Sequence, residues 1–202
     1  MASILEVVAL FVVMFLRKES VAQNFSTSEC GNSKGCLFQP NNCIPFQTCA
    51  YAMSYSATNS GDVIFEILGQ VTAPYNTYVA LGFNNAAQMD GATVTACASY
   101  NGSPFLGRLT YNPATYNLNV PIDQNTQSNI LQTIYSGVVN NTLYCKVTQT
   151  ISPPSNIPSN FVAPLNQTFY ILMVSGPTQT GNNPALLKHS THYISPQMVN
   201  LL

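Results

Sequence analysis

Apolar and polar residues alternate over short stretches along most of the chain, and residues with turn chemistry separate these stretches. In residues 62–68, Val63, Phe65 and Ile67 fall on one side of an extended chain. The opposite side is also too apolar to be fully wet, which indicates that loops or a ligand cover it. An Asn-Ser-Gly turn at 59–61 joins this stretch to a similar one at 51–58, and the pair predicts a β-hairpin.

Further stretches with strand character recur at short spacing, and none keeps a long 3.6-residue period between helix caps. They are residues 76–83, 92–99, 104–110, 115–120, 131–139, 142–149 and 169–176. This succession predicts an all-β fold, an antiparallel sandwich, rather than alternating strands and helices. Residues 23–50 have little periodicity and read as a loop segment, and the proline-rich residues 152–166 as a long surface loop.

Composition narrows the possible partners. Of the 202 residues only 6% are charged and 46% are hydrophobic, and the formal net charge is −1. The length suits one domain with a sizeable core, and no change of composition divides it after residue 50. Because no basic patch exists, nucleic acid is not an expected partner.

The N-terminus predicts secretion. Residues 4–16 are apolar except for Glu6, and this run is too short to span a bilayer. Ser20-Val21-Ala22 then offers a cleavage site for signal peptidase. We therefore expect a signal peptide at 1–22, a Cys-rich segment at 23–50 and a β-sandwich at 51–202, secreted without a membrane span. An uncleaved anchor is the alternative.

Six cysteines follow the predicted signal peptide, and an even number in a secreted chain implies disulfides. We expect local bridges among Cys30, Cys36, Cys43 and Cys49, and a separate bridge from Cys97 to Cys145. No C-x-x-C pair is present, so a zinc site is not expected. Glycan acceptor patterns at Asn24, Asn140 and Asn166 support secretion, and the one at Asn101 is discounted because Pro104 follows it.

Catalytic chemistry has little support in the sequence. The five acidic residues after position 22 show no paired spacing, and neither a G-x-S-x-G elbow nor a P-loop occurs. Residues 78–97 are more informative, because they join an apolar strand, a polar loop with Met89, and a second strand that ends in Cys97. A thioether beyond a strand end can be a soft metal ligand or a gap-filling side chain.

Several loose motifs occur in the order found in one family. They are "valGFnn...M.g..v..C" within 78–97, "lyCkvt" at 143–148, "fyilmvsGp" at 169–177 and "l.kHs..y.sp" at 187–196. Together they resemble the DOMON family, over about residues 30–200. The pattern from Cys30 to Cys49 resembles the animal members that are similar to ferric-chelate reductases.

The resemblance implies a two-sheet, immunoglobulin-like antiparallel sandwich of about ten strands, with the disulfide-stapled N-terminal segment. In the cytochrome members it also implies one b-type haem (haem b) held without a covalent bond. Met89 and His189 match the iron ligands, with His192 as the alternative to His189, and Phe83 and Tyr193 are expected to line the site. Covalent attachment is excluded because no C-x-x-C-H occurs.

The function implied is a secreted electron-transfer module with no catalytic activity of its own, at most the redox partner of a reductase. Filled axial positions on both sides of the iron suit electron transfer rather than oxygen binding. A separate membrane protein of the cytochrome b561 type is the expected partner. The alternative is an extracellular module that binds carbohydrate or protein, or mediates adhesion, without haem.

Overall fold

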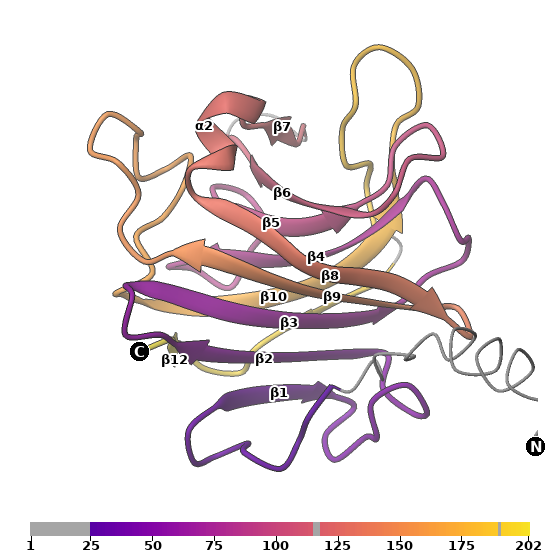
Figure 1. Ribbon diagram of the computed structural model, residues 1–202, viewed down its shortest axis with the longest axis vertical. Helices are drawn as coiled ribbons and strands as arrows, with labels where there is room; N and C mark the ends of the chain where they lie inside the picture. The colour runs from indigo at the N-terminus through magenta and orange to yellow at the C-terminus, as the bar shows by residue number, and fades with distance from the viewer. Residues whose placement is uncertain (1–24, 115–117, 190) are drawn as a thin grey trace, which may run out of the picture.

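The computed structural model describes residues 25–114, 118–189 and 191–202, so the predicted signal peptide at 1–22 lies outside the described residues. The described chain is all-β and forms two antiparallel sheets that pack face to face. In Figure 1 they lie one behind the other, so that β8 and β9 overlap β4 and β10 in the view. The predicted sandwich is confirmed.

The first sheet has five strands in the order β1-β2-β3-β9-β8. Their bounds are β1 (Gly35–Gln39), β2 (Tyr51–Ala57), β3 (Asp62–Gln70), β9 (Thr142–Thr150) and β8 (Leu131–Val139). β2 and β3 form the expected hairpin, with Met53 opposite Ile67. One irregularity interrupts the β8–β9 pairing, between Thr133 and Tyr135.

The second sheet has seven strands and runs β11-β10-β4-β5-β6-β7, with β12 paired to β10. Their bounds are β11 (Thr191–Ile194), β10 (Thr168–Pro177), β4 (Thr77–Asn84), β5 (Thr93–Ala98), β6 (Leu106–Tyr111), β7 (Val120–Pro121) and β12 (Val199–Asn200). Of the stretch predicted at 115–120, residues 115–117 lie outside the described part. β11 and β12 were not among the predicted strands.

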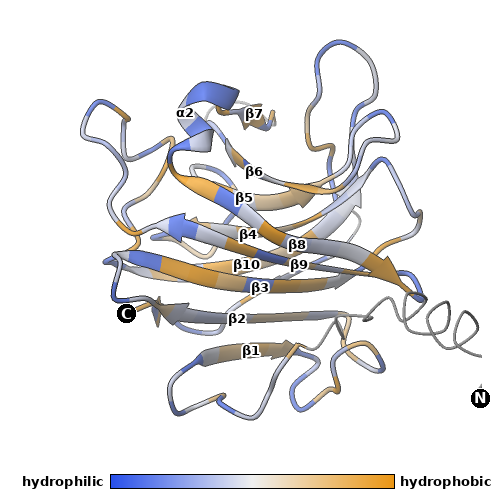
Figure 2. Ribbon diagram, in the orientation of Figure 1, coloured by the Kyte–Doolittle hydropathy of each residue, from blue (hydrophilic) through white to orange (hydrophobic). Residues whose placement is uncertain are grey.

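The main core lies between the sheets. On β3 the side chains of Val63, Phe65 and Ile67 point into it and are almost fully buried, as the alternation predicts. Leu81 on β4 and Ile171 on β10 approach from the other sheet. Figure 2 shows apolar residues concentrated on the central strands and polar residues in the connecting loops. Burial of these apolar faces is the main force that holds the two sheets together.

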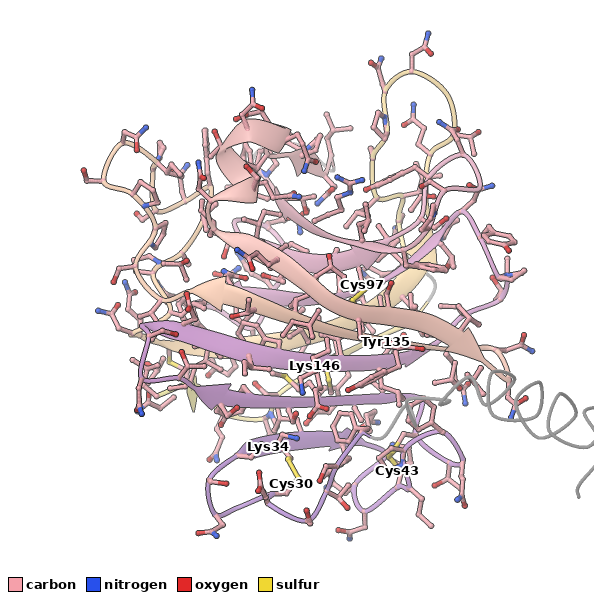
Figure 3. All side chains as sticks on the ribbon, in the orientation of Figure 1. Cys30, Lys34, Cys43, Cys97, Tyr135 and Lys146 are labelled. Carbon is pink, nitrogen blue, oxygen red and sulfur yellow. A yellow bond between two sulfur atoms is a disulfide. The ribbon has the colours of Figure 1, made fainter. Side chains whose placement is uncertain are left out.

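Three disulfides join the cysteines as expected, and no free cysteine remains among the described residues. Cys30–Cys36 and Cys43–Cys49 are local, and Cys97–Cys145 joins β5 to β9 across the core. The last bridge fixes the direction in which its strands face, because both sulfurs must point between the sheets. Figure 3 labels Cys97 in the sandwich and Cys30 and Cys43 in the N-terminal segment.

The N-terminal segment is more ordered than the expected loop. Residues 35–39 form β1 and extend the first sheet, with Phe38 opposite Ala52. Its aromatic residues cover the outer face of that sheet: Phe25 and Phe46 make edge contacts with Tyr144, and Leu68 belongs to the same cluster. This cover explains why the outer side of the 62–68 stretch is apolar.

A buried ion pair lies under that cover. Lys34 bonds Glu66, and the carboxylate also accepts hydrogen bonds from Ser54 at 2.7 Å and Tyr144 at 2.6 Å. Burial by itself raises the pKa of Glu66, but the hydrogen bonds from Lys34, Tyr144 and Ser54 outweigh it and leave the pKa lowered. Figure 3 labels Lys34 beside β1. The pair therefore links the stapled segment to the sheet.

A short helix, α2 (Gln124–Ser128), has no counterpart among the predicted elements. Its sequence, QNTQS, is polar throughout and carries no apolar period, as the blue ribbon in Figure 2 shows. It starts at Asp123, whose side chain accepts from the Thr126 N–H. Gln127 then docks it on β6 by bonding the Leu109 N–H and the Gly107 carbonyl. Among the described residues, no helix is long and apolar enough to cross a membrane.

The buried ion pair yields a prediction on stability. Glu66→Gln leaves Lys34 without its anion and should lower the free energy of unfolding by about 3 kcal/mol at neutral pH. Because the pKa of Glu66 is lower in the folded state, the stabilisation is present above the unfolded pKa and is lost as the pH falls through the folded pKa. Urea unfolding at neutral pH and at about pH 3 measures both effects.

The exposed Glu29 is the matched control, and Glu29→Gln should change stability by no more than about 0.5 kcal/mol. The destabilisation caused by Glu66→Gln should shrink as the pH falls through the folded pKa of Glu66, because the wild-type carboxylate then takes up a proton. A Glu66→Gln protein as stable as wild type at neutral pH contradicts the role of the pair.

Candidate functional site

The outer face of the second sheet is buried as well as its inner face. Small and apolar side chains cover it on three neighbouring strands: Tyr78 and Ala80 on β4, Val94, Ala96 and Ala98 on β5, and Val174 on β10. Antiparallel sheets commonly leave one face to water. Here Leu186 and the side chain of Met89 pack against that face and form a second apolar cluster.

Residues 178–189, which we call the strap, lie over this face. A bridge from Thr178 to Leu186 and a bond from the Leu187 N–H to the Pro177 carbonyl hold it beside β10. The Tyr78 hydroxyl donates to the Leu187 carbonyl at 2.9 Å. Gly176 lets the chain approach the sheet closely, because a Cβ there would lie 3.1 Å from the Cα of His189. These contacts set the position of His189.

Residues 85–91, which we call the Met loop, are held by side-chain amides. Asn84 donates to the carbonyls of Gln88 and Asp90, each at 2.8 Å. The Met89 carbonyl accepts from the Ala92 N–H at 3.1 Å and from the Asn112 side chain at 3.2 Å. Gly91 closes the loop with φ of 81°, a conformation that favours glycine. Met89 is therefore presented from an anchored turn.

The strap and the Met loop border a cleft of about 330 Å³, within the range of small-molecule sites. Both predicted ligands line it, although 99 residues separate them in the sequence. The lining residues with an apolar character are Tyr78, Ala80, Met89, Val94, Leu118, Val174, Leu186 and Leu187, and the polar ones are Asp90, Asn112, Asn119, Lys188 and His189. Met89 and His189 are each partly buried.

The other two predicted site residues lie elsewhere. Phe83 points between the sheets, with its ring centroid 5.6 Å from that of Phe65 and 5.7 Å from that of Phe169. Tyr193 packs against the same core. Phe83 faces the core because side chains alternate along a strand. Val79 pairs with Cys97, whose disulfide faces the core, so every second residue from Val79 to Phe83 faces the core as well. Neither Phe83 nor Tyr193 lines the cleft.

Sequence reasoning missed Tyr78, Ala80 and Val174, which form the floor of the cleft. The same alternation could have found the first two, because they have the opposite parity to Val79 on β4. To assign Tyr78 and Ala80 to the outer face in this way, one must know how β4 pairs with β5, and the sequence does not show that pairing.

His189 has bonding capacity that the protein does not use. Its Nδ1 is buried and has no hydrogen-bond partner. Burial lowers the pKa of the imidazole, and the neighbouring His192 and Lys188 lower it further. These effects favour the neutral ring, which is the form that binds a metal ion.

His192 lies beside His189, with ring centroids 5.1 Å apart in an edge-to-face contact. His192 is exposed and lies on β11, opposite Val174 of β10. It is not among the residues that line the cleft. The two histidines are thus on the same side of the sheet, and His189 is the one in the cleft.

Three buried side-chain atoms in the described residues lack a hydrogen-bond partner, and all three lie around this face of the second sheet. They are Nδ1 of His189, Oδ1 of Asn119 and Nε of Arg108. Native proteins leave few such atoms, because each costs about 1–3 kcal/mol. His189 and Asn119 line the cleft itself. No group of three or more His, Cys, Asp or Glu side chains in the described residues could hold a metal ion.

The family model of the DOMON domain matches residues 47–176, which include β4, the Met loop, β5 and most of β10. This chain belongs to the DOMON family. The match covers more than half of the chain, and it ends before the strap that carries His189.

Two curated relatives are similar to this DOMON chain. A Danio rerio protein named "Putative ferric-chelate reductase 1" is 27% identical over 180 residues, which are 86% of this chain and 28% of the relative. A Drosophila melanogaster protein of the same name, with the word homolog added, is 26% identical over 76% of this chain and 23% of the relative. The chain spans about a quarter of the length of these relatives.

Among solved structures, the fold is similar to the cytochrome domain of cellobiose dehydrogenase from Myriococcum thermophilum. The TM-score is 0.52, with 9% sequence identity, and the match covers 80% of this chain and 79% of that domain. At this identity the likeness shows a shared fold and no more.

The anchoring of the strap yields a second prediction. Tyr78→Phe removes the donor to the Leu187 carbonyl and should weaken local closure of the strap by about 1 kcal/mol. Amide hydrogen exchange in residues 186–189 should then speed up roughly fivefold. Tyr75, which is 56% exposed, supplies the control Tyr75→Phe, and it should leave that exchange unchanged. Equal exchange in Tyr78→Phe and wild type contradicts this anchor.

Proposed function

We propose that this DOMON domain is an extracellular electron-transfer module that holds one b-type haem in the cleft, with Met89 and His189 as the axial ligands. The observation that carries the proposal is the meeting of these two side chains, from distant parts of the chain, at a single apolar cleft. The DOMON match and the cytochrome-domain fold support the same reading.

The residues present fit the cofactor. A thioether and an imidazole are established ligands of haem iron, and the buried Nδ1 of His189 has no hydrogen-bond partner among the described residues. The side chains of Ala80, Val94 and Val174 give the cleft a small, apolar wall, which suits contact with a flat macrocycle. When bound, the haem would supply one-electron transfer between ferric and ferrous iron.

The chain's own residues then have separate tasks. Met89 supplies a soft ligand that favours ferrous iron, and the amide groups of Asn84 and Asn112 fix its loop. His189 supplies a neutral nitrogen, held in place by Tyr78 and Gly176. With Met89 and His189 both bound to it, the haem would offer no free site for a substrate, so the module would transfer electrons and perform no catalysis itself.

The partner and location follow from the same proposal. The names of the two relatives point to ferric-chelate reduction, and we infer that the module exchanges electrons with a membrane reductase unit of the cytochrome b561 type. Three disulfides suit an oxidising compartment outside the cell.

Absorption spectra of protein titrated with haemin test the proposal. Wild type should give a b-type Soret band and a six-coordinate, low-spin spectrum. Met89→Leu and His189→Ala should each abolish the low-spin spectrum while leaving thermal unfolding nearly unchanged, because both residues lie in connecting segments. Met198→Leu, at a side chain 39% exposed, is the matched control and should behave as wild type.

The separate variant His192→Ala should retain the native spectrum, since His192 does not line the cleft. Loss of ligation in His192→Ala alone would transfer the ligand role to that residue. Wild-type protein that shows no spectral shift with haemin would overturn the proposed function and favour a binding or adhesion module without haem.

A further inference from the structure

A second hollow of about 330 Å³ lies beside the cleft on the same side of the second sheet. Arg108 on β6 is its one cationic lining residue. The ring of Tyr100 lies next to the guanidinium, with Cζ 5.8 Å from the ring centroid, and Thr110, Gln124 and Gln127 add polar groups. We call this space the arginine hollow.

Strand register relates the arginine hollow to the floor of the cleft. Val174, Ala80 and Ala96 lie in one row across β10, β4 and β5, and Arg108 is the next residue of that row on β6. Neighbouring strands are about 4.8 Å apart, so the backbone of Arg108 lies about 10 Å from that of Ala80. Ala96 is the residue of the row between them, so Arg108 is the first long side chain of the row beyond the floor of the cleft.

The charge of Arg108 has no acidic partner within the described part of the chain. Its Nη1 donates to Oε1 of Gln124 at 2.6 Å, its Nε is buried without a partner, and the ion pair found among the described residues joins Lys34 to Glu66 instead. A guanidinium matches a carboxylate through two parallel N–H groups, and such charged hydrogen bonds are about twice as strong as neutral ones. The cation therefore lacks the partner that its geometry suits.

A polar wall connects the arginine hollow with the cleft. Asn119, which lines the cleft, donates to Thr110, which lines the arginine hollow, at 2.7 Å. It also donates to Asn112 at 3.0 Å, and Asn112 in turn holds the carbonyl of Met89. The remaining oxygen of Asn119 is the second buried atom without a partner. The two spaces are thus parts of one surface with unmet polar groups at their border.

We propose that Arg108 binds a carboxylate arm of the haem held in the cleft, and so fixes the in-plane orientation of the macrocycle. This inference rests on the proposed function. A b-type haem carries two carboxylate arms at one edge, and Arg108 is a cation without an acidic partner among the described residues, toward which that edge can point along the sheet. Its positive charge would also favour ferrous iron, so Arg108 is a positioning residue that raises the midpoint potential.

Haemin and its dimethyl ester are the two probes, because the ester lacks the charged arms but keeps the iron and the macrocycle. Arg108→Gln should weaken the binding of haemin about tenfold, as expected for the loss of charged hydrogen bonds, and leave the affinity for the ester unchanged. Arg108→Lys should show a smaller loss. The midpoint potential of the haemin complex should fall in Arg108→Gln.

Lys146 supplies the control for loss of one positive charge, because it lies on β9 in the other sheet (Figure 3). Lys146→Gln should bind both probes as wild type does. Thermal unfolding of each variant shows whether the fold is retained; if Arg108→Gln does not fold, the comparison of the two probes in Arg108→Lys decides.

The outcomes separate this inference from the proposed function. Wild-type protein that binds haemin and the ester with equal affinity, or an Arg108→Gln variant that loses both probes equally, overturns the role of Arg108 and leaves the haem site standing. Orthophosphate or acetate that binds haem-free wild type, but not Arg108→Gln, without competing with haemin would instead make the hollow an independent anion site. Wild-type protein that binds neither probe overturns both proposals.

Discussion

Burial on both faces of the second sheet is the constraint on which the rest of the structure depends. All residues of β5 are buried, and on β4 all but the last are buried. The apolar outer side of these strands must therefore be covered by other parts of the chain rather than by water. The Met loop and the strap provide that cover, but they approach from opposite sides and leave the cleft between them. Met89 and His189, the candidate ligands, therefore lie on the two segments that cover the outer face of the sheet.

Small side chains give this arrangement its shape. The short side chains of Ala80 and Ala96 project little from the outer face of the sheet. Gly176 lets the strap come close enough for the Tyr78 hydroxyl to donate a hydrogen bond to it. The buried side-chain atoms that lack a hydrogen-bond partner in the described part of the chain lie around this same face: they belong to the imidazole of His189, the amide of Asn119 and the guanidinium of Arg108. In a well-packed protein this concentration has a cost, and a bound group that uses these atoms would remove it.

Much of the fold was predictable because alternation and turn residues are local signals. The strands of the core and the three disulfides came from patterns within short stretches or from family resemblance, which also named Met89 and His189 as the candidates that the structure places at one cleft. What was missed depends on long-range pairing. β1 is a strand because it has β2 as a partner, α2 is held by side-chain bonds of Gln127 to β6, and the face of Phe83 follows from the register between β4 and β5. None of these partners is visible in a local pattern.

A crystal structure of the protein grown with haemin measures the central claim most directly. The account predicts iron in the cleft, with the sulfur of Met89 on one side, a ring nitrogen of His189 on the other, and the macrocycle over Ala80 and Val174. An empty cleft at saturating haemin, or haem bound by other residues, would contradict it.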